Sequence, residues 1–168
     1  GVADPNLSLA PVATALGQLM NAEITFAGDC IGQTATTALT GLPAGGICVL
    51  ENTRFHAGEE ADDADFAAAL AAPAHAYVND AFSAAHRAHA STHALAKLLP
   101  AYCGLAMQAE LDALNSALGN PARPLVAVVG GAKISTKLEL IGNLTRKVDT
   151  LIIGGGMANT FLAAQGIE

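Results

Sequence analysis

Two glycine clusters in the last third of the chain each follow a run of β-branched residues. They consist of Gly130 and Gly131 in the first cluster and of Gly154, Gly155 and Gly156 in the second. Lys133 and Lys137 follow the first cluster, four residues apart. Glycine lets backbone N–H groups approach an anion closely, and a helix N-terminus adds donors with positive partial charge. We therefore expect a phosphate site, with both lysines on one face of a helix and directed at the same polyphosphate.

Other interpretations of these glycines stay open. Tight turns between strands and helices often carry glycine without a ligand. The spacing matches neither the P-loop pattern nor the dinucleotide pattern G-x-G-x-x-G, which disfavours a nicotinamide-dependent oxidoreductase built on Gly154. Two clusters at the carboxyl ends of successive strands, together with paired lysines, favour a ligand, because open α/β sheets bind ligands there.

A second motif, residues 51–56, directly follows the apolar run 47–50. Its Arg54 would lie at the ligand-binding edge of a sheet, where the planar guanidinium suits a carboxylate or a phosphate. The alternative is an ordinary surface ion pair between Glu51 and Arg54. The acidic run that follows, residues 59–65, we expect to be a solvated loop and helix start.

A third motif, residues 79–92, again follows an expected strand and contains Arg87. Three histidines, His86, His89 and His93, could share one helical face, so a metal site has to be considered. No cysteine or carboxylate accompanies them at ligand spacing, and we therefore expect no metal site. The favoured interpretation is that Arg87 binds an anion while the histidines donate hydrogen bonds or pack.

The composition limits the classes of function that fit. The 168 residues are 52% hydrophobic but only 4% aromatic, without tryptophan, which is typical of an α/β protein with buried parallel strands. The formal net charge is −7, which argues against nucleic-acid binding and against binding to an anionic membrane through a general basic surface. An anionic ligand would have to be held by a few well-placed cations.

The elements expected to position these residues alternate along the chain. Helices are expected at 8–19 with Ser8 as the cap, at 31–39, in a segment ending at residue 70, and at 105–118. Strands are expected at 23–26, 47–50 and 76–78, and a further β-α-β unit from residue 125. This alternation predicts parallel strands covered by helices. The break at residues 120–124, flanked by prolines, is the best candidate for a domain boundary.

The cysteines and the chain ends bear on the compartment. The three cysteines, Cys30, Cys48 and Cys103, form no C-x-x-C pair and have apolar neighbours, which predicts buried, reduced thiols. No run of apolar residues approaches membrane-spanning length, and the first residues do not have the pattern of a secretory signal. We therefore expect a cytoplasmic protein without membrane partners.

Five segments, taken in this order, resemble the phosphoglycerate kinase family. They are residues 8–12, 50–55, 77–92, 130–137 and 152–161. The resemblance runs over essentially the whole chain, although each piece alone is only moderately specific. Ser83 and Ala84 depart from the Gly-Thr of the family, just before Arg87.

The resemblance implies an α/β fold of two Rossmann-like lobes that face a cleft. Residues 1–104 would then belong to the N-terminal, phosphoglycerate-binding lobe, residues 105–120 to an interdomain helix, and residues 121–168 to the start of the C-terminal, nucleotide-binding lobe. Both lobes would be incomplete, so we expect an internal fragment of the enzyme and a monomer.

The resemblance also implies the reaction and its residues. The reaction would be reversible phosphoryl transfer between ATP and 3-phosphoglycerate, giving ADP and 1,3-bisphosphoglycerate, with Mg²⁺ bound to the nucleotide. Arg54 and Arg87 would bind the phosphoglycerate, and Lys137 and Arg54 would act in catalysis. The nucleotide phosphates would lie against Gly131, Lys133, Lys137, Gly154, Gly155 and Gly156. The alternative is an inactive fragment that only binds nucleotide or phosphate.

Overall fold

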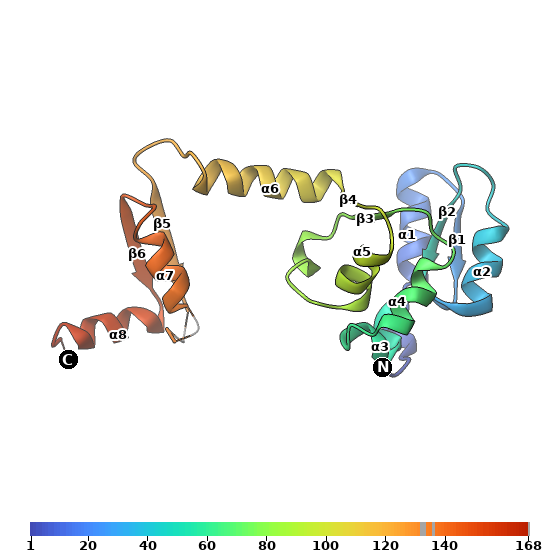
Figure 1. Cartoon of the computed structure of the whole chain (residues 1–168), viewed down its shortest axis with the longest axis horizontal. Coiled ribbons are helices and arrows are strands. Elements are labelled where there is room, and N and C mark those ends of the chain that lie inside the picture. The colour runs from blue at the N-terminus through green and yellow to red at the C-terminus, as the bar shows by residue number, and fades with distance from the viewer. Residues whose placement is uncertain (132–133, 136, 168) are drawn as a thin grey trace. The chain divides into compact units, whose positions relative to one another are not determined.

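The computed structural model describes residues 1–131, 134–135 and 137–167, and it divides into two compact units (Figure 1). The first unit is Gly1–Gln108 and the second is Ala109–Glu168. Helices and strands alternate in both, so the predicted α/β class is confirmed. The assignment of residues 1–104, 105–120 and 121–168 to two lobes and a linking helix stays a prediction.

In the first unit the strands form two parallel pairs. Strand β1 (Ile24–Ala27) pairs with β2 (Ile47–Leu50), so that Ile24 lies opposite Ile47 and Ala27 opposite Leu50. Strand β3 (Tyr77–Asn79) pairs with β4 (Ala101–Cys103). The carboxyl ends of β2 and β3 therefore carry the motifs that contain Arg54 and Arg87, as the sequence predicted.

Helices α1 (Ala10–Met20) and α2 (Gly32–Thr40) pack against the first strand pair. Helix α1 has a proline in its first turn and ends at Met20, and the left-handed backbone of its C-cap, Asn21 (φ 47°), closes the last turn. The predicted start at Ser8 was wrong. A short 3₁₀ helix, Pro5–Leu7, comes first, and the cap position of α1 is Leu9.

Helices α3 (Ala57–Glu60) and α4 (Ala64–Ala71) follow the Arg54 motif. The Asp63 carboxylate accepts a 2.8 Å hydrogen bond from the backbone N–H of Phe66 and so caps α4, which is typically worth about 1 kcal/mol. Helix α4 buries Phe66 and Ala67 in a core cluster that also contains Ala90. This core packs the α3–α4 region against the segment that follows Arg87.

The segment after β3 is irregular. A 3₁₀ helix, Phe82–Ala84, is followed by a π-helical turn, η4 (Ala90–Ala94), and by α5 (Leu95–Leu98). Because no regular helix spans residues 86–93, the three histidines do not share a helical face, and that expectation was wrong. His89 instead occupies the cap position of η4.

Helix α6 (Leu105–Leu118) has the bounds predicted for it, and the boundary between the units falls within it. The second unit then forms the predicted β-α-β arrangement, in which β5 (Val126–Gly130) and β6 (Thr150–Gly154) are parallel and Gly130 lies opposite Gly154. Helices α7 (Leu138–Leu144) and α8 (Gly156–Ala164) complete it. Val129, Ile141 and Met157 form its buried core.

Two further properties bear on function. Cys30 is buried, Cys48 is half-buried and Cys103 is exposed, and all three are free thiols, so the expectation of burial was wrong for Cys103 on the exposed strand β4. Of the helices in the described ranges, none has the length and apolar character needed to cross a membrane.

Candidate functional site

Arg54 lies in a short 3₁₀ helix, Thr53–Phe55, just beyond the carboxyl end of β2. The side-chain oxygen of Asn52 caps this turn by accepting a 3.1 Å hydrogen bond from the Arg54 backbone N–H. The Arg54 side chain is half exposed, and its Nε lies 3.9 Å from Oε1 of Glu60. An exposed pair at this distance is weak, so the guanidinium is available to a stronger anion.

Glu51 does not supply the surface partner that was considered for Arg54. Its carboxylate accepts hydrogen bonds from the Ser8 hydroxyl (2.5 Å), the Leu9 backbone N–H (2.8 Å) and its neighbour Asn52 (2.7 Å). Partial burial opposes ionisation, but these hydrogen bonds outweigh it and hold the pKa of Glu51 below its ordinary value. Glu51 therefore fastens the Arg54 loop to the start of α1.

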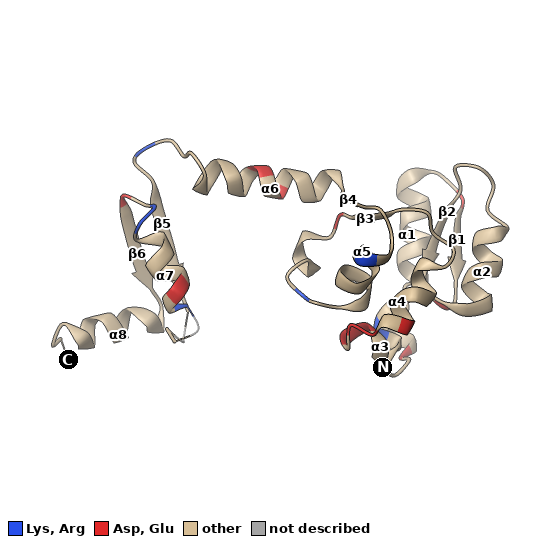
Figure 2. Ribbon diagram, in the orientation of Figure 1, with Lys and Arg blue, Asp and Glu red and all other residues tan. Residues whose placement is uncertain are grey.

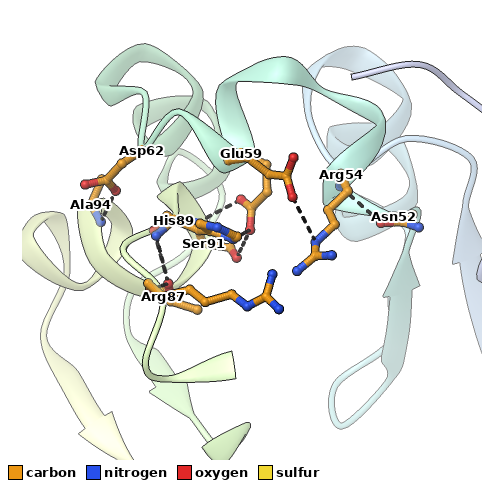
Figure 3. A network of polar contacts seen from close by, with 10 residues as sticks. Asn52, Arg54, Glu59, Asp62, Arg87, His89, Ser91 and Ala94 are labelled. Atoms are coloured by element: carbon orange, nitrogen blue, oxygen red, sulfur yellow. Dashed lines mark hydrogen bonds and ion pairs between the residues drawn. The ribbon is translucent and has the colours of Figure 1, made fainter. Parts of the chain in front are cut away.

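Arg87 comes from the irregular segment after β3, and its side chain is exposed. Its backbone N–H donates to the carbonyl of Ala84 (3.1 Å), and its carbonyl accepts a 2.7 Å hydrogen bond from the Thr92 hydroxyl. Figure 3 shows the guanidinium groups of Arg54 and Arg87 directed into the same space from two separate segments. Two guanidinium forks that face one space suit a bidentate anion such as a phosphate or a carboxylate.

Two acidic side chains, Glu59 and Asp62, hold the segment that follows Arg87. Glu59 is only 3% exposed, and its carboxylate accepts from Ser91 twice, at 3.0 Å from the backbone N–H and at 2.5 Å from the hydroxyl. Asp62 accepts from Nδ1 of His93 (2.5 Å) and from the backbone N–H of Ala94 (3.1 Å). The hydrogen bond from His93 is the main reason that the pKa of Asp62 is lowered.

The expectation of a solvated acidic run was therefore wrong for Glu59. Figure 2 shows a group of acidic residues at α3 and the start of α4. One of them turns inward to Ser91, which lies 32 residues later in the chain. No local sequence signal marks such a pair.

One group among the described residues could hold a metal ion: the ligand atoms of Asp29, Cys30 and His56 lie within 4.8 Å of one another. His56 Nε2 is hydrogen-bonded to the Asp29 carboxylate at 2.8 Å, and the His56 ring stacks on Phe66. Burial raises the pKa of the Cys30 thiol to about 11, which favours the protonated thiol over the thiolate that a metal requires. The group is thus satisfied by its own hydrogen bonds.

In the second unit, the predicted glycines meet at the carboxyl ends of β5 and β6. Gly131 has φ +146° and Gly155 has φ +66°, conformations that favour glycine. A Cβ atom on Gly155 would lie 3.1 Å from the backbone nitrogen of Gly131, so the two turns fit closely only without side chains. The backbone N–H of Met157 donates to the Gly131 carbonyl at 2.9 Å and ties the start of α8 to the end of β5.

Lys137 reaches the same edge, although not from a helix. Helix α7 begins at Leu138, so Lys137 precedes it, and the expectation that this lysine lies on a helical face was wrong. Its Nζ donates a 3.0 Å hydrogen bond to the carbonyl of Gly130. Lys133 lies outside the described residues. The structure therefore brings Lys137 together with Gly131 and with Gly154, whose strand ends beside Gly130.

The whole chain, residues 1–168, matches the sequence model of a family described as phosphoglycerate kinase. It is 62% identical over 162 residues to a phosphoglycerate kinase of Caulobacter vibrioides and 64% identical over 165 residues to one of Azorhizobium caulinodans. These alignments cover 96% and 98% of this chain but 41% and 42% of the relatives. The chain thus spans about two-fifths of the length of the curated relatives it matches.

Solved structures agree with the sequence comparison. A phosphoglycerate kinase from Coxiella burnetii, 43% identical, superposes with a TM-score of 0.82 over 99% of this chain and 41% of that one. A phosphoglycerate kinase from Pyrococcus horikoshii, 30% identical, gives a TM-score of 0.81 over 96% of this chain and 42% of that one.

Proposed function

The chain belongs to the phosphoglycerate kinase family, and from this we propose that it takes part in reversible phosphoryl transfer between ATP and 3-phosphoglycerate. The products are ADP and 1,3-bisphosphoglycerate, and the reaction is a step of glycolysis. The observation that carries the proposal is the convergence of Arg54 and Arg87 on one space (Figure 3).

The acceptor substrate is assigned to Arg54 and Arg87. The molecule 3-phosphoglycerate carries a phosphate and a carboxylate, and both match the planar fork of a guanidinium. The weak contact between Arg54 and Glu60, at 3.9 Å, supports this role, because a doubly charged phosphate competes easily with an exposed carboxylate. Arg54 also acts in catalysis here by orienting the acceptor.

The nucleotide phosphates are assigned to the glycine edge of the second unit. The residues are Gly131, Lys133, Lys137, Gly154, Gly155 and Gly156. Helix α8, a nine-residue helix, begins at this edge, and its N-terminus brings positive partial charge there. Its Met157 and Ala158 N–H groups donate to the carbonyls of Gly131 and Gly155, and the glycine conformations keep side chains away from the edge. Lys137 supplies the positive charge.

Phosphoryl transfer requires positioning and charge neutralisation more than covalent help. In this proposal Lys137 exchanges its hydrogen bond to the Gly130 carbonyl for one to the transferred phosphoryl group. The carbonyls of Gly130 and Gly131 at this edge already accept hydrogen bonds from Lys137 and Met157, and the described residues there place no carboxylate beside them, so the edge suits a phosphate better than a bare cation. Mg²⁺ therefore fits here as the complex with ATP or ADP, where it would offset phosphate charge.

The location and assembly that we propose follow the family. We place the protein in the cytoplasm as a monomer whose partners are ATP or ADP and the phosphoglycerates, without nucleic-acid or membrane partners. The net charge of −7 supports the exclusion of nucleic acid.

A second candidate is a fragment that binds nucleotide or phosphate without catalysis. The share of the relatives that the chain spans, 41% for the Caulobacter vibrioides protein, favours it for the isolated 168 residues. The two candidates differ in turnover but not in binding.

A coupled assay separates them. The complete gene product that contains this chain, and the 168-residue chain alone, are each given ATP and 3-phosphoglycerate, and the 1,3-bisphosphoglycerate formed is followed through NADH oxidation by glyceraldehyde-3-phosphate dehydrogenase. We expect NADH oxidation by the complete gene product that depends on both substrates. Its absence there would overturn the kinase proposal, and binding without turnover would favour the second candidate.

A further inference from the structure

Glu59 is a buried carboxylate to which the proposed reaction gives no role. We propose that Glu59 is a positioning residue, which sets the Arg87 segment relative to Arg54 so that both guanidiniums reach one phosphoglycerate. This inference rests on the proposed function.

A buried contact between Glu59 and Ser91 joins the two segments. Glu59 is 3% exposed, yet both of its oxygens accept hydrogen bonds from Ser91: Oε2 from the backbone N–H at 3.0 Å and Oε1 from the hydroxyl at 2.5 Å. Nδ1 of His89 lies 3.9 Å from Oε1. A buried carboxylate with two good donors is strongly held, because leaving either donor unpaired is costly.

Hydrogen bonds within the turn extend from this contact to Arg87. Thr92, next to Ser91, donates its hydroxyl hydrogen to the Arg87 carbonyl at 2.7 Å, and its Oγ1 accepts a hydrogen bond from the His89 backbone N–H at 3.2 Å. Residues 87–92 thus form one internally hydrogen-bonded turn, which Glu59 holds at Ser91 (Figure 3).

Glu59 is also joined to the segment that carries Arg54. Helix α3 begins two residues after the 3₁₀ helix that carries Arg54, and the Glu59 backbone N–H donates to the His56 carbonyl at 3.2 Å. The Arg54 turn is itself capped by Asn52. Glu59 therefore lies between the two arginine-bearing segments and bonds to both.

The charge of Glu59 and its positioning role predict opposite changes in anion affinity when the charge is removed. A negative charge near two arginines weakens anion binding through Coulomb repulsion, so its removal alone would raise the affinity for an anion. Glu59→Gln keeps the size of the side chain, but its NH₂ can meet the Ser91 hydroxyl only if that hydroxyl turns to accept, and both contacts lose the charge that strengthens them. A loss of affinity in this variant would come from displaced geometry.

The test is calorimetric titration of 3-phosphoglycerate into the complete gene product. We expect Glu59→Gln to weaken binding about tenfold, the scale expected when two charge-assisted hydrogen bonds become neutral. Ser91→Ala should weaken it in the same direction, Ser91→Thr should retain wild-type affinity, and the double variant Glu59→Gln/Ser91→Ala should bind no more weakly than Glu59→Gln. If Glu59→Gln does not fold, the Ser91 variants decide the question.

Leu70→Ala is the matched control, because Leu70 packs against the same core cluster and its apolar side chain takes no part in the hydrogen bonds between Glu59 and Ser91. An equal loss of affinity in Leu70→Ala, at equal loss of stability, would overturn the positioning role, and so would unchanged or higher affinity in Glu59→Gln. If the wild-type protein does not bind 3-phosphoglycerate, the proposed function fails instead, which is a separate result.

Discussion

The ammonium of Lys137 donates a 3.0 Å hydrogen bond to the carbonyl oxygen of Gly130, at the carboxyl end of β5. Gly130 lies opposite Gly154 in the parallel ladder, so this one contact places a positive charge at the end of both strands. A hydrogen bond to a neutral carbonyl is weaker than one to a phosphate oxygen. The lysine can therefore be transferred to a phosphate at little cost.

We predict that Lys137→Ala in the complete gene product lowers kcat about a hundredfold or more and raises KM for ATP much less. The reason is that the lost charge acts mainly on the transferring group, as with other donors aimed at a transition state. Steady-state kinetics of the coupled assay measure both constants. Lys147→Ala, at an exposed position in the same unit, should leave both unchanged. A change confined to KM would contradict the assigned role.

The turn at Gly155 gives a prediction about stability. Gly155→Ala should lower the free energy of unfolding by about 1–3 kcal/mol, because φ +66° with ψ −162° is unfavourable for residues with a side chain. Gly142→Ala is the matched control in α7, where a Cβ meets nothing within 4 Å and alanine favours the helix by about 0.5–1 kcal/mol. Urea denaturation should thus shift in opposite directions for the two variants, and equal shifts would rule out the backbone explanation.

Acid should weaken the first unit. The pKa values of Glu51, Asp29 and Asp62 are lowered in the folded protein, where hydrogen bonds to each carboxylate outweigh any cost of burial. A lowered folded pKa means stability that is fully present above the unfolded value, about 4, and is lost as pH falls through the folded pKa. Urea midpoints measured from pH 7 to pH 3 should therefore decrease below about pH 4.

Glu51→Gln measures the contribution of one carboxylate to the loss of stability in acid. The variant should be less stable than the wild type at pH 7, because an amide cannot accept all three hydrogen bonds, and the difference should shrink at pH 3. Glu110→Gln, an exposed position in α6, is the control. A constant difference between Glu51→Gln and the wild type across this range would show that ionisation of Glu51 is not involved.

Local patterns predicted much of the fold. Strand β2 and helix α6 have the predicted bounds, because an apolar run before a polar loop and an apolar 3.6-residue period are local signals. The same patterns indicated that Arg54, Arg87 and the glycine clusters follow strands. These signals placed the motifs at the correct ends of the strands.

Features that depend on distant residues were missed. In the sequence, Glu59 is one of several acidic residues that are expected to be solvated. Only the fold shows that Ser91, 32 residues later, is its partner. The start of α7 after Lys137 was also not predicted. Lys137 has φ −126° and ψ 5°, outside the helical region, although the two lysines four residues apart are a pattern typical of a helix. The irregular backbone between residues 84 and 90 likewise separated histidines that a helix would have aligned.

The most direct test of the account is a calorimetric titration of 3-phosphoglycerate into the complete gene product and its arginine variants. We predict one site per chain, with at least tenfold weaker binding in Arg54→Ala and in Arg87→Ala, since each removes a charged hydrogen-bond donor. Arg123→Ala, which removes the partner of Asp149 in the second unit, should bind as the wild type does. Wild-type affinity in both Arg54→Ala and Arg87→Ala would contradict the claim that these two residues hold the substrate.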